Sequence, residues 1–401
     1  MRSVRAIFFL LLCPLLLSLS LTLTGCGDAS PEPPPPPESV VPILANDLAW
    51  DPVYKKIYLS LPSIDAPTGN SVQVVDPYRG SLDQHVFAGS EPNLLSVSQT
   101  SKYLYVSLNG SSNVQRLSLP DLAPDIEIPL GSSSFDGPYY AMDMQAAPNA
   151  DATVAVVRGT PGVSPEEEGG VLIYDDAVAR PNVLCGWIEA GCINPGGPAL
   201  FDSIQWNADA SQLYAANYES SAFDFYTIPV SAPGFGTVTD YRGVIRGYSD
   251  RIHYDPVTSY LYGNDGEVID PATGTFVGTF ADSGLMVPDG ANKIAYFLGQ
   301  TPAQLGTADY TIESFSMEHF TPILSVTVAN VTGSPTHLIL WGSNGLAFTT
   351  VDRSVSPQTG AVYILSSSYL NGDTTAGLLS TENVQGVPPA QSLGSLEGSK
   401  P

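Results

Sequence analysis

Short runs in which apolar and polar residues alternate recur along residues 39–370, and they predict β-strands. In four segments an apolar residue opens such a run, a polar turn follows, and an apolar–tyrosine pair begins nine residues after the opening residue. These segments are LAWDPVYKKIYLS from Leu48, LSVSQTSKYLYVS from Leu95, IQWNADASQLYAA from Ile204 and IHYDPVTSYLYGN from Ile252. Alternation on both sides of a polar turn predicts a β-hairpin. The tyrosine at one fixed offset predicts equivalent positions in equivalent units.

Three looser segments extend the repeat to seven units. They are MDMQAAPNADATVAVV from Met142, LMVPDGANKIAYFLG from Leu285 and LILWGSNGLAFTTV from Leu338. A third strand and a wide turn follow several hairpins, as in VQVVDPYRG and EVIDPATG, and a fourth strand follows each of these, HVFAG and TFVGTF. Seven units of four strands predict an all-β fold, a seven-bladed β-propeller, because radial repetition leaves few exposed strand edges.

The last unit supplies only three strands, at residues 338–340, 346–351 and 361–365. Residues 40–44, VVPIL, directly precede the first unit and can supply the missing fourth strand. A ring closed by both ends of the repeat region removes a free edge that would otherwise pair with other chains. We therefore predict that an N-terminal strand closes the ring.

The hairpin resembles the YVTN-type (YncE-like) repeat of bacterial surface and periplasmic propellers. LSVSQTSKYLYVS and LMVPDGANKIAYFLG fit that repeat best. The resemblance implies the propeller fold but specifies function poorly, because such propellers serve as binding scaffolds, as lactonases and as dehydrogenase subunits.

The N-terminus has the layout of a secretory signal, with Arg2 and Arg5 before an apolar stretch at residues 6–23. The four residues that end at Cys26, LTGC, resemble the lipobox of bacterial lipoproteins, which implies that residues 1–25 are removed and that Cys26 carries lipid. The alternative is an ordinary secreted protein with an incidental cysteine. Residues 26–38 form a proline-rich linker, predicted as a polyproline II tether. Residues 371–401 are polar and predicted to be a disordered tail after the propeller at residues 39–370.

The net charge limits the classes of partner, and the cysteines predict a disulfide. The chain has 15 basic and 40 acidic residues; without Arg2 and Arg5, 13 basic residues remain, and 13 minus 40 gives a mature net charge near −27. Such a field repels phosphate backbones, so nucleic acid is excluded as a partner. In an oxidising compartment, Cys185 and Cys192 of CGWIEAGC are predicted to form a disulfide. Zinc would need four ligands, and no histidine is near this loop.

In a propeller the innermost strands line a central channel, and ligands meet the residues just before those strands. That position predicts a candidate channel-mouth set of Asp47, Asn93, Tyr140, Asp202, Asp250, Arg251 and His337. The alternative is the ordinary polarity of strand starts, with Arg251 paired to Asp250 or Asp202 as a rigid rim. Calcium on Asp47, Asp202 and Asp250 is a possible cofactor, although no local calcium-loop spacing supports it. We assign no catalytic residue, no metal ligand and no other cofactor, because the sequence has no nucleophile elbow and no phosphate loop.

These features together predict a monomeric, lipid-anchored binding or scaffold propeller of the bacterial cell envelope, without catalysis. The lipid would hold it at the outer membrane or another periplasmic face, and its partner would be a protein or small molecule of the envelope. The alternative is a propeller enzyme, either a lactonase-like hydrolase or a dehydrogenase-like subunit, with its site at the channel mouth. An enzyme requires several acidic or histidine side chains that converge at one mouth.

Overall fold

The computed structural model describes residues 38–371, apart from residues 66, 164, 165, 167, 168, 187–191, 194–200, 219–222, 248, 250 and 300–305. Cys26, the predicted signal and linker, the predicted tail and Asp250 therefore lie outside the described residues. Within the described part the regular secondary structure is almost entirely β-strand, and the single helix, α1 (Ser367–Leu370), is one turn long. That part of the chain contains no helix with the length and apolar character needed to cross a membrane.

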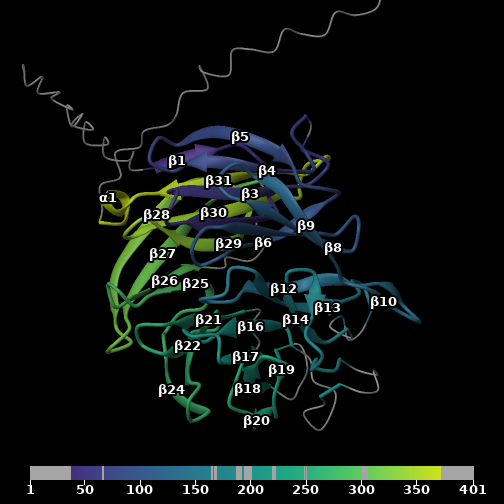
Figure 1. The fold of residues 1–401 in the computed structure, drawn as a ribbon. Coiled ribbons are helices and arrows are strands. Elements are labelled where there is room, and N and C mark those ends of the chain that lie inside the picture. Colours follow the sequence, from purple (N-terminus) through teal and green to yellow (C-terminus); the bar gives the residue numbers. More distant parts are fainter. Residues whose placement is uncertain are drawn as a thin grey trace, which may run out of the picture. The chain divides into compact units, whose positions relative to one another are not determined.

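The strands group into seven antiparallel sheets in chain order, which are the blades of a β-propeller (Figure 1). Blade 1 contains β2 (Asp47–Asp51), β3 (Lys56–Leu61), β4 (Ser71–Asp76) and β5 (Ser81–Phe87). Blade 2 contains β6 (Pro92–Val97), β7 (Tyr103–Leu108), β8 (Asn113–Ser118) and β9 (Ala123–Pro129). Blade 3 contains β12 (Tyr140–Ala146), β13 (Thr153–Gly159), β14 (Val171–Asp175) and β15 (Val178–Ala179). A small hairpin of β10 (Ser132–Ser133) and β11 (Gly137–Pro138) precedes blade 3.

Blades 4 to 7 complete the series. Blade 4 contains β16 (Ser203–Trp206), β17 (Gln212–Ala216), β18 (Asp224–Ser231) and β19 (Gly234–Phe235), and β20 (Thr239–Arg242) pairs with β18 as a fifth strand. Blade 5 contains β21 (Ile252–Asp255), β22 (Tyr260–Gly263), β23 (Glu267–Asp270) and β24 (Thr275–Thr279). Blade 6 contains β25 (Gly284–Asp289), β26 (Ile294–Gly299), β27 (Thr307–Ser316) and β28 (Pro322–Thr332). Blade 7 contains β29 (Ser334–Trp341), β30 (Gly345–Asp352), β31 (Thr359–Leu365) and β1 (Glu38–Val41). The predicted seven-bladed fold is confirmed.

The N-terminal strand closes the ring, as predicted. In Figure 1, β1 at the purple end of the described chain lies beside β31 at its yellow end, and Val40 pairs with Tyr363 in the ladder. The strand ends at Val41, earlier than the predicted range of residues 40–44, because Pro42 has no N–H to donate to the ladder. Ile43 and Leu44 are not strand residues but are buried, so they hold the entry to blade 1 by packing.

The core is divided among the blade interfaces. The buried apolar side chains of the described residues form seven clusters, and each cluster joins two neighbouring blades. The repeated tyrosines of the sequence lie on the second strand of their blades and are all buried: Tyr58, Tyr105, Tyr214 and Tyr262. Each belongs to the cluster shared with the following blade. The repeat is therefore a device for joining blades.

Hydrogen bonds from the hairpin turns reinforce the same joints. Asp51 ends β2, its Oδ2 accepts a hydrogen bond from the Tyr58 hydroxyl at 3.1 Å, and its Oδ1 accepts one from Ser101 of blade 2 at 2.6 Å. The next joint follows the same plan, because the Tyr105 hydroxyl donates to the Asp151 carbonyl of blade 3 at 2.7 Å. Burial raises the pKa of Tyr105 to about 12, so this phenol keeps its donor proton at neutral pH.

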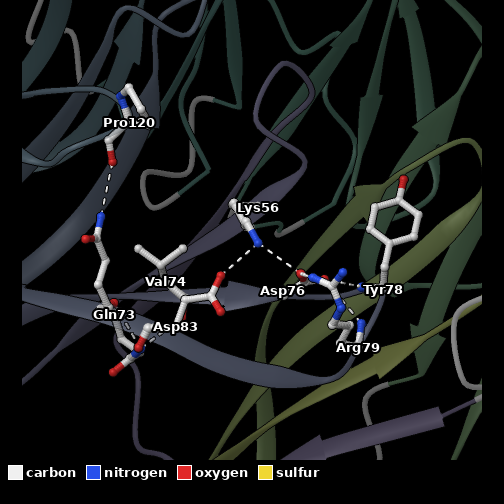
Figure 2. A network of polar contacts seen from close by, with 9 residues as sticks. Lys56, Gln73, Val74, Asp76, Tyr78, Arg79, Asp83 and Pro120 are labelled. Atoms are coloured by element: carbon white, nitrogen blue, oxygen red, sulfur yellow. Dashed lines mark hydrogen bonds and ion pairs between the residues drawn. The ribbon is translucent and has the colours of Figure 1, made fainter. Parts of the chain in front are cut away.

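A charged network fixes the outer strands of blade 1 (Figure 2). Lys56 Nζ lies 2.9 Å from Asp76 Oδ2 and 2.7 Å from Asp83 Oδ2, and Arg79 approaches Asp76 at 2.8 Å. Burial acts to raise the pKa of Asp76, but the hydrogen bond and charge of Lys56 outweigh burial and lower it. This carboxylate therefore stabilises the fold above the ordinary carboxyl pKa, and its contribution is lost as the pH falls through the lowered folded-state value.

The predicted disulfide is confirmed. Cys185 and Cys192 are bonded, with their Cα atoms 5.2 Å apart. Cys185 is buried, and its neighbour Leu184 pairs in isolated bridges with Val171 of β14 and with Ile193. The bridge therefore ties a loop after β15 back to blade 3.

Candidate functional site

A cavity of about 460 Å³ runs between the innermost strands of the blades. The first strand of every blade contributes to its lining, so the cavity is the axial channel of the propeller. Consecutive residues of an inner strand reach the lining, as Asp47 to Trp50 of β2 do, because the side chains alternate between the two neighbouring blade interfaces while the strand edge faces the channel. In β2, for example, Leu48 is buried within the blade interface and Ala49 is half-buried at the channel.

One half-buried residue per blade forms a ring around the channel, which we call the channel ring. Four consecutive blades, 2 to 5, contribute polar members: Ser96, Gln145, Gln205 and His253. The remaining three, blades 6, 7 and 1, contribute apolar members: Val287, Ile339 and Ala49. The channel ring therefore has a polar side and an apolar side, while Asp47 and His337 add polar groups just before the ring in blades 1 and 7.

Two buried aspartates hold neighbouring inner strands together at the level just before the ring. The Oδ1 of Asp47 accepts the Leu48 N–H at 2.8 Å, and its Oδ2 accepts the N–H of Leu95 in blade 2 at 2.8 Å. Asp143 repeats this arrangement between blades 3 and 4, with Met144 at 2.8 Å and Ile204 at 2.7 Å. Both oxygens of each carboxylate thus accept backbone amides. These aspartates join blades, and their charge is spread over those donors.

Sequence reasoning missed Asp143. Asp47 directly precedes the opening residue Leu48, and Asp143 precedes Met144 in the same way, but the interpretation placed the opening of the third unit at Met142 instead of Met144. A register irregularity between Ala141 and Asp143 in the β12–β13 ladder shifts this strand. Burial raises the pKa of Asp143, and the positive charge of Arg251 acts against that rise. Arg251 is therefore close enough for its charge to act on this carboxylate.

Arg251 and His337 also line the channel. Arg251 directly precedes β21 and is the only Lys or Arg among the described residues of the lining. No described residue places a carboxylate within 4.0 Å of its guanidinium. His337 Nε2 lies 3.9 Å from Asp47 Oδ1, so these two side chains meet across the junction of blades 7 and 1.

His253 of the channel ring is oriented from behind. Its Nε2 lies 3.0 Å from the Asn264 Oδ1, which also accepts the N–H of Met286 in blade 6 at 3.2 Å. Because a carboxamide oxygen only accepts, this contact assigns the proton to Nε2. Asn264 therefore fixes the imidazole and joins blades 5 and 6.

Of the predicted channel-mouth residues, Asp47, Arg251 and His337 line the channel, whereas Asn93, Tyr140 and Asp202 do not. The Asn93 carbonyl accepts the Ser60 hydroxyl at 2.5 Å, and the Asp202 carboxylate accepts the Tyr218 N–H. Tyr140 opens β12. Asp250 lies outside the described residues, so its proposed pairing with Arg251 stays a prediction.

The described residues contain no group of three or more His, Cys, Asp or Glu side chains that are placed to hold a metal ion. Asp47, one of the three residues considered for calcium, already has both oxygens engaged by amides. The described lining offers hydrogen bonding from three carboxamides, two hydroxyls, two imidazoles and an indole, together with one guanidinium and the carboxylate of Asp47.

Comparison with known proteins places the fold. No family model matches the chain, and no curated protein matches it. Among solved structures it is similar to a chain of the hydrazine synthase of Kuenenia stuttgartiensis, with 12% identity and a TM-score of 0.54 over 77% of this chain and 93% of that one. It is also similar to the β-propeller domain of Cps50 (Swd1) from Myceliophteria thermophila, with 11% identity and a TM-score of 0.58 over 82% of this chain and 99% of that one. At these identities the likeness shows the propeller fold alone.

Proposed function

We propose that this chain is a lipid-anchored propeller of the bacterial cell envelope that binds a small-molecule ligand in its channel without transforming it. The observation that carries the proposal is the channel ring, whose polar members come from four consecutive blades and whose apolar members come from the other three. A cavity of this volume, in which polar side chains lie beside apolar surface, has the size of a small-molecule pocket and the convergent polar groups that orient a ligand.

Binding is favoured over catalysis by the state of the acidic groups. Asp47 is the one carboxylate among the described residues of the lining, and two backbone amides hold it in place. A hydrolase of the lactonase type would need carboxylates free to bind metal or to accept a proton. Gln145 and Gln205, whose carboxamides have no hydrogen-bond partner among the described residues, neither titrate nor act as nucleophiles.

The anchoring part of the proposal rests on the N-terminal sequence. Arg2 and Arg5, the apolar stretch and the LTGC motif ending at Cys26 together have the layout of a lipoprotein signal. Each CH₂ group of a lipid chain that is buried in a membrane contributes about 0.8 kcal/mol of favourable transfer free energy, and the sum holds the protein at the membrane. The resemblance of the hairpins to YVTN-type repeats favours a bacterial envelope as the location.

Replacing Cys26 with Ser is expected to release the chain from membranes or to block its processing, because serine offers no thiol for the lipid. Membrane and soluble fractions of expressing cells are compared by immunoblot. Cys13→Ser is the matched control, since it removes the other N-terminal cysteine and leaves the motif intact, and it should remain anchored. A Cys26→Ser protein that is still membrane-bound and cleaved at the same site would refute the lipoprotein assignment.

A further inference from the structure

We propose that the channel ligand is a small hydroxylated carboxylate, of the size of a sugar acid, and that Arg251 receives its carboxylate group. The inference rests on the proposed binding function and adds the chemical class of the ligand. Its basis is the arrangement, around one cavity, of one guanidinium and a channel ring with a polar and an apolar side.

The guanidinium is the first element of the argument. Arg251 carries five N–H donors in a planar fork that matches a carboxylate in two parallel hydrogen bonds. It lines the channel half-buried, and among the described residues no carboxylate lies within 4.0 Å of it. A guanidinium that is always charged needs acceptors, and an anionic group in the channel supplies them.

The nearby carboxylates already accept backbone amides, so they leave the Arg251 guanidinium available for an anionic ligand. The charges of Asp143 and Arg251 act on one another, yet both oxygens of Asp143 accept backbone N–H groups of β12 and β16. Asp47 is held in the same way between β2 and β6. Both carboxylates are therefore fixed as joints between blades. Their presence also disfavours a doubly charged phosphate, which would experience stronger repulsion than a single carboxylate.

The ring defines the rest of the ligand. Gln145 and Gln205 lie on neighbouring blades, and no described residue accepts or donates a hydrogen bond to either carboxamide. Each carboxamide offers two donors and an acceptor, which suits the alternating donor and acceptor character of hydroxyl groups. Opposite them, Val287 and Ile339 present apolar surface to the C–H groups of the same molecule. A carboxylate that bears hydroxyl groups on one edge satisfies all three features.

The test is isothermal titration calorimetry of the full mature chain in detergent, with D-glucuronate and D-gluconate as singly charged probes and D-glucose as the uncharged match for glucuronate. We expect at least one of the two acids to bind saturably and glucose to bind at least tenfold more weakly than glucuronate. Arg251→Gln should weaken acid binding at least tenfold. Arg79→Gln is the control, because Arg79 is exposed on blade 1 away from the channel, and it should bind like the wild type.

A second variant guards against a folding defect at Arg251. Gln145→Ala removes a half-buried carboxamide and should weaken the acid without changing the melting temperature. If glucose and glucuronate bind equally well and Arg251→Gln does not weaken either, the claim that Arg251 binds a carboxylate is wrong. The proposed binding function would be unaffected by that result. If neither acid binds the wild-type chain, the inference is wrong, whereas the envelope anchoring is decided separately by Cys26→Ser.

Discussion

Deletion of Glu38–Val41 is expected to lower the free energy of unfolding by about 5 to 7 kcal/mol, because it opens the ring at the joint between distant parts of the chain. Val41 is buried at 4% exposure, and burying one such side chain contributes about 1.5–3 kcal/mol. The ladder of four residue pairs with β31 contains about four backbone hydrogen bonds, and each one lost adds roughly 1 kcal/mol. Denaturant unfolding of the mature chain measures the change.

The deletion also leaves β31 as an unpaired edge, which promotes association between chains. The deleted protein is therefore expected to contain a larger fraction of higher oligomers than the wild type when both are compared by size-exclusion chromatography at the same concentration. Pro42→Ala is the control, because Pro42 is exposed and follows the strand, and its stability should match the wild type. An unchanged unfolding midpoint after the deletion would show that the ring does not depend on β1.

Replacing Asp143 with Ala is expected to destabilise the fold by about 3 to 4 kcal/mol. The change removes the acceptor of two buried amides, those of Met144 and Ile204, and each orphaned amide costs about 1–3 kcal/mol. Relief from burying a charge offsets part of that cost. Asp136→Ala, which changes an exposed aspartate before blade 3, should have little effect. The two variants are compared by chemical denaturation at neutral pH.

The loss of unfolding free energy caused by Asp143→Ala should become smaller as the pH rises from acidic to neutral. Burial raises the folded-state pKa of Asp143, so the folded chain holds this proton more tightly than the unfolded chain. The wild-type free energy of unfolding therefore falls as the pH rises from the ordinary carboxyl pKa through the raised value. The variant lacks this loss, and the difference between the two proteins should shrink from acidic to neutral pH. A difference that grows with pH would contradict the assigned burial.

Much of the fold is predictable from the sequence because each blade repeats the same physical solution. The tyrosines at one offset, Tyr58 among them, fill equivalent sites between blades, and the polar turn before each ends the inner strand. Closure was predictable by counting strands in the last unit. The exact end of β1 was missed because the apolar run of residues 40–44 continues past Pro42, and the prediction did not allow for its missing N–H.

The channel was only partly predictable. Residues two apart on a strand lie on the same face, so the pattern of alternation does not tell which of them reaches the channel. The prediction chose positions before the inner strands, so it found Asp47 and Arg251 but not the channel ring, which lies two residues further along. No sequence motif distinguishes Gln145 and Gln205 from ordinary strand residues. They are recognisable only once the seven inner strands are placed around one axis.

The blades contain two kinds of residue at equivalent positions. Residues that recur from blade to blade, such as Tyr105 and Asp51, contact neighbouring blades and build the ring. Residues that occupy equivalent channel positions but differ in kind, such as Gln205 and Ile339, give the channel its two sides. In a repeat protein, function is therefore best sought where the repeat is broken at equivalent channel positions.

The most direct test of the account is a crystal structure of the mature chain grown with D-glucuronate. The account predicts ligand density inside the channel, with the carboxylate about 3 Å from the Arg251 guanidinium and hydroxyl groups at hydrogen-bond distance from Gln145 and Gln205. It also predicts that Asp47 and Asp143 keep their bonds to the inner-strand amides. A ligand seated outside the channel, or Arg251 paired with a protein carboxylate while the channel holds only water, would contradict it.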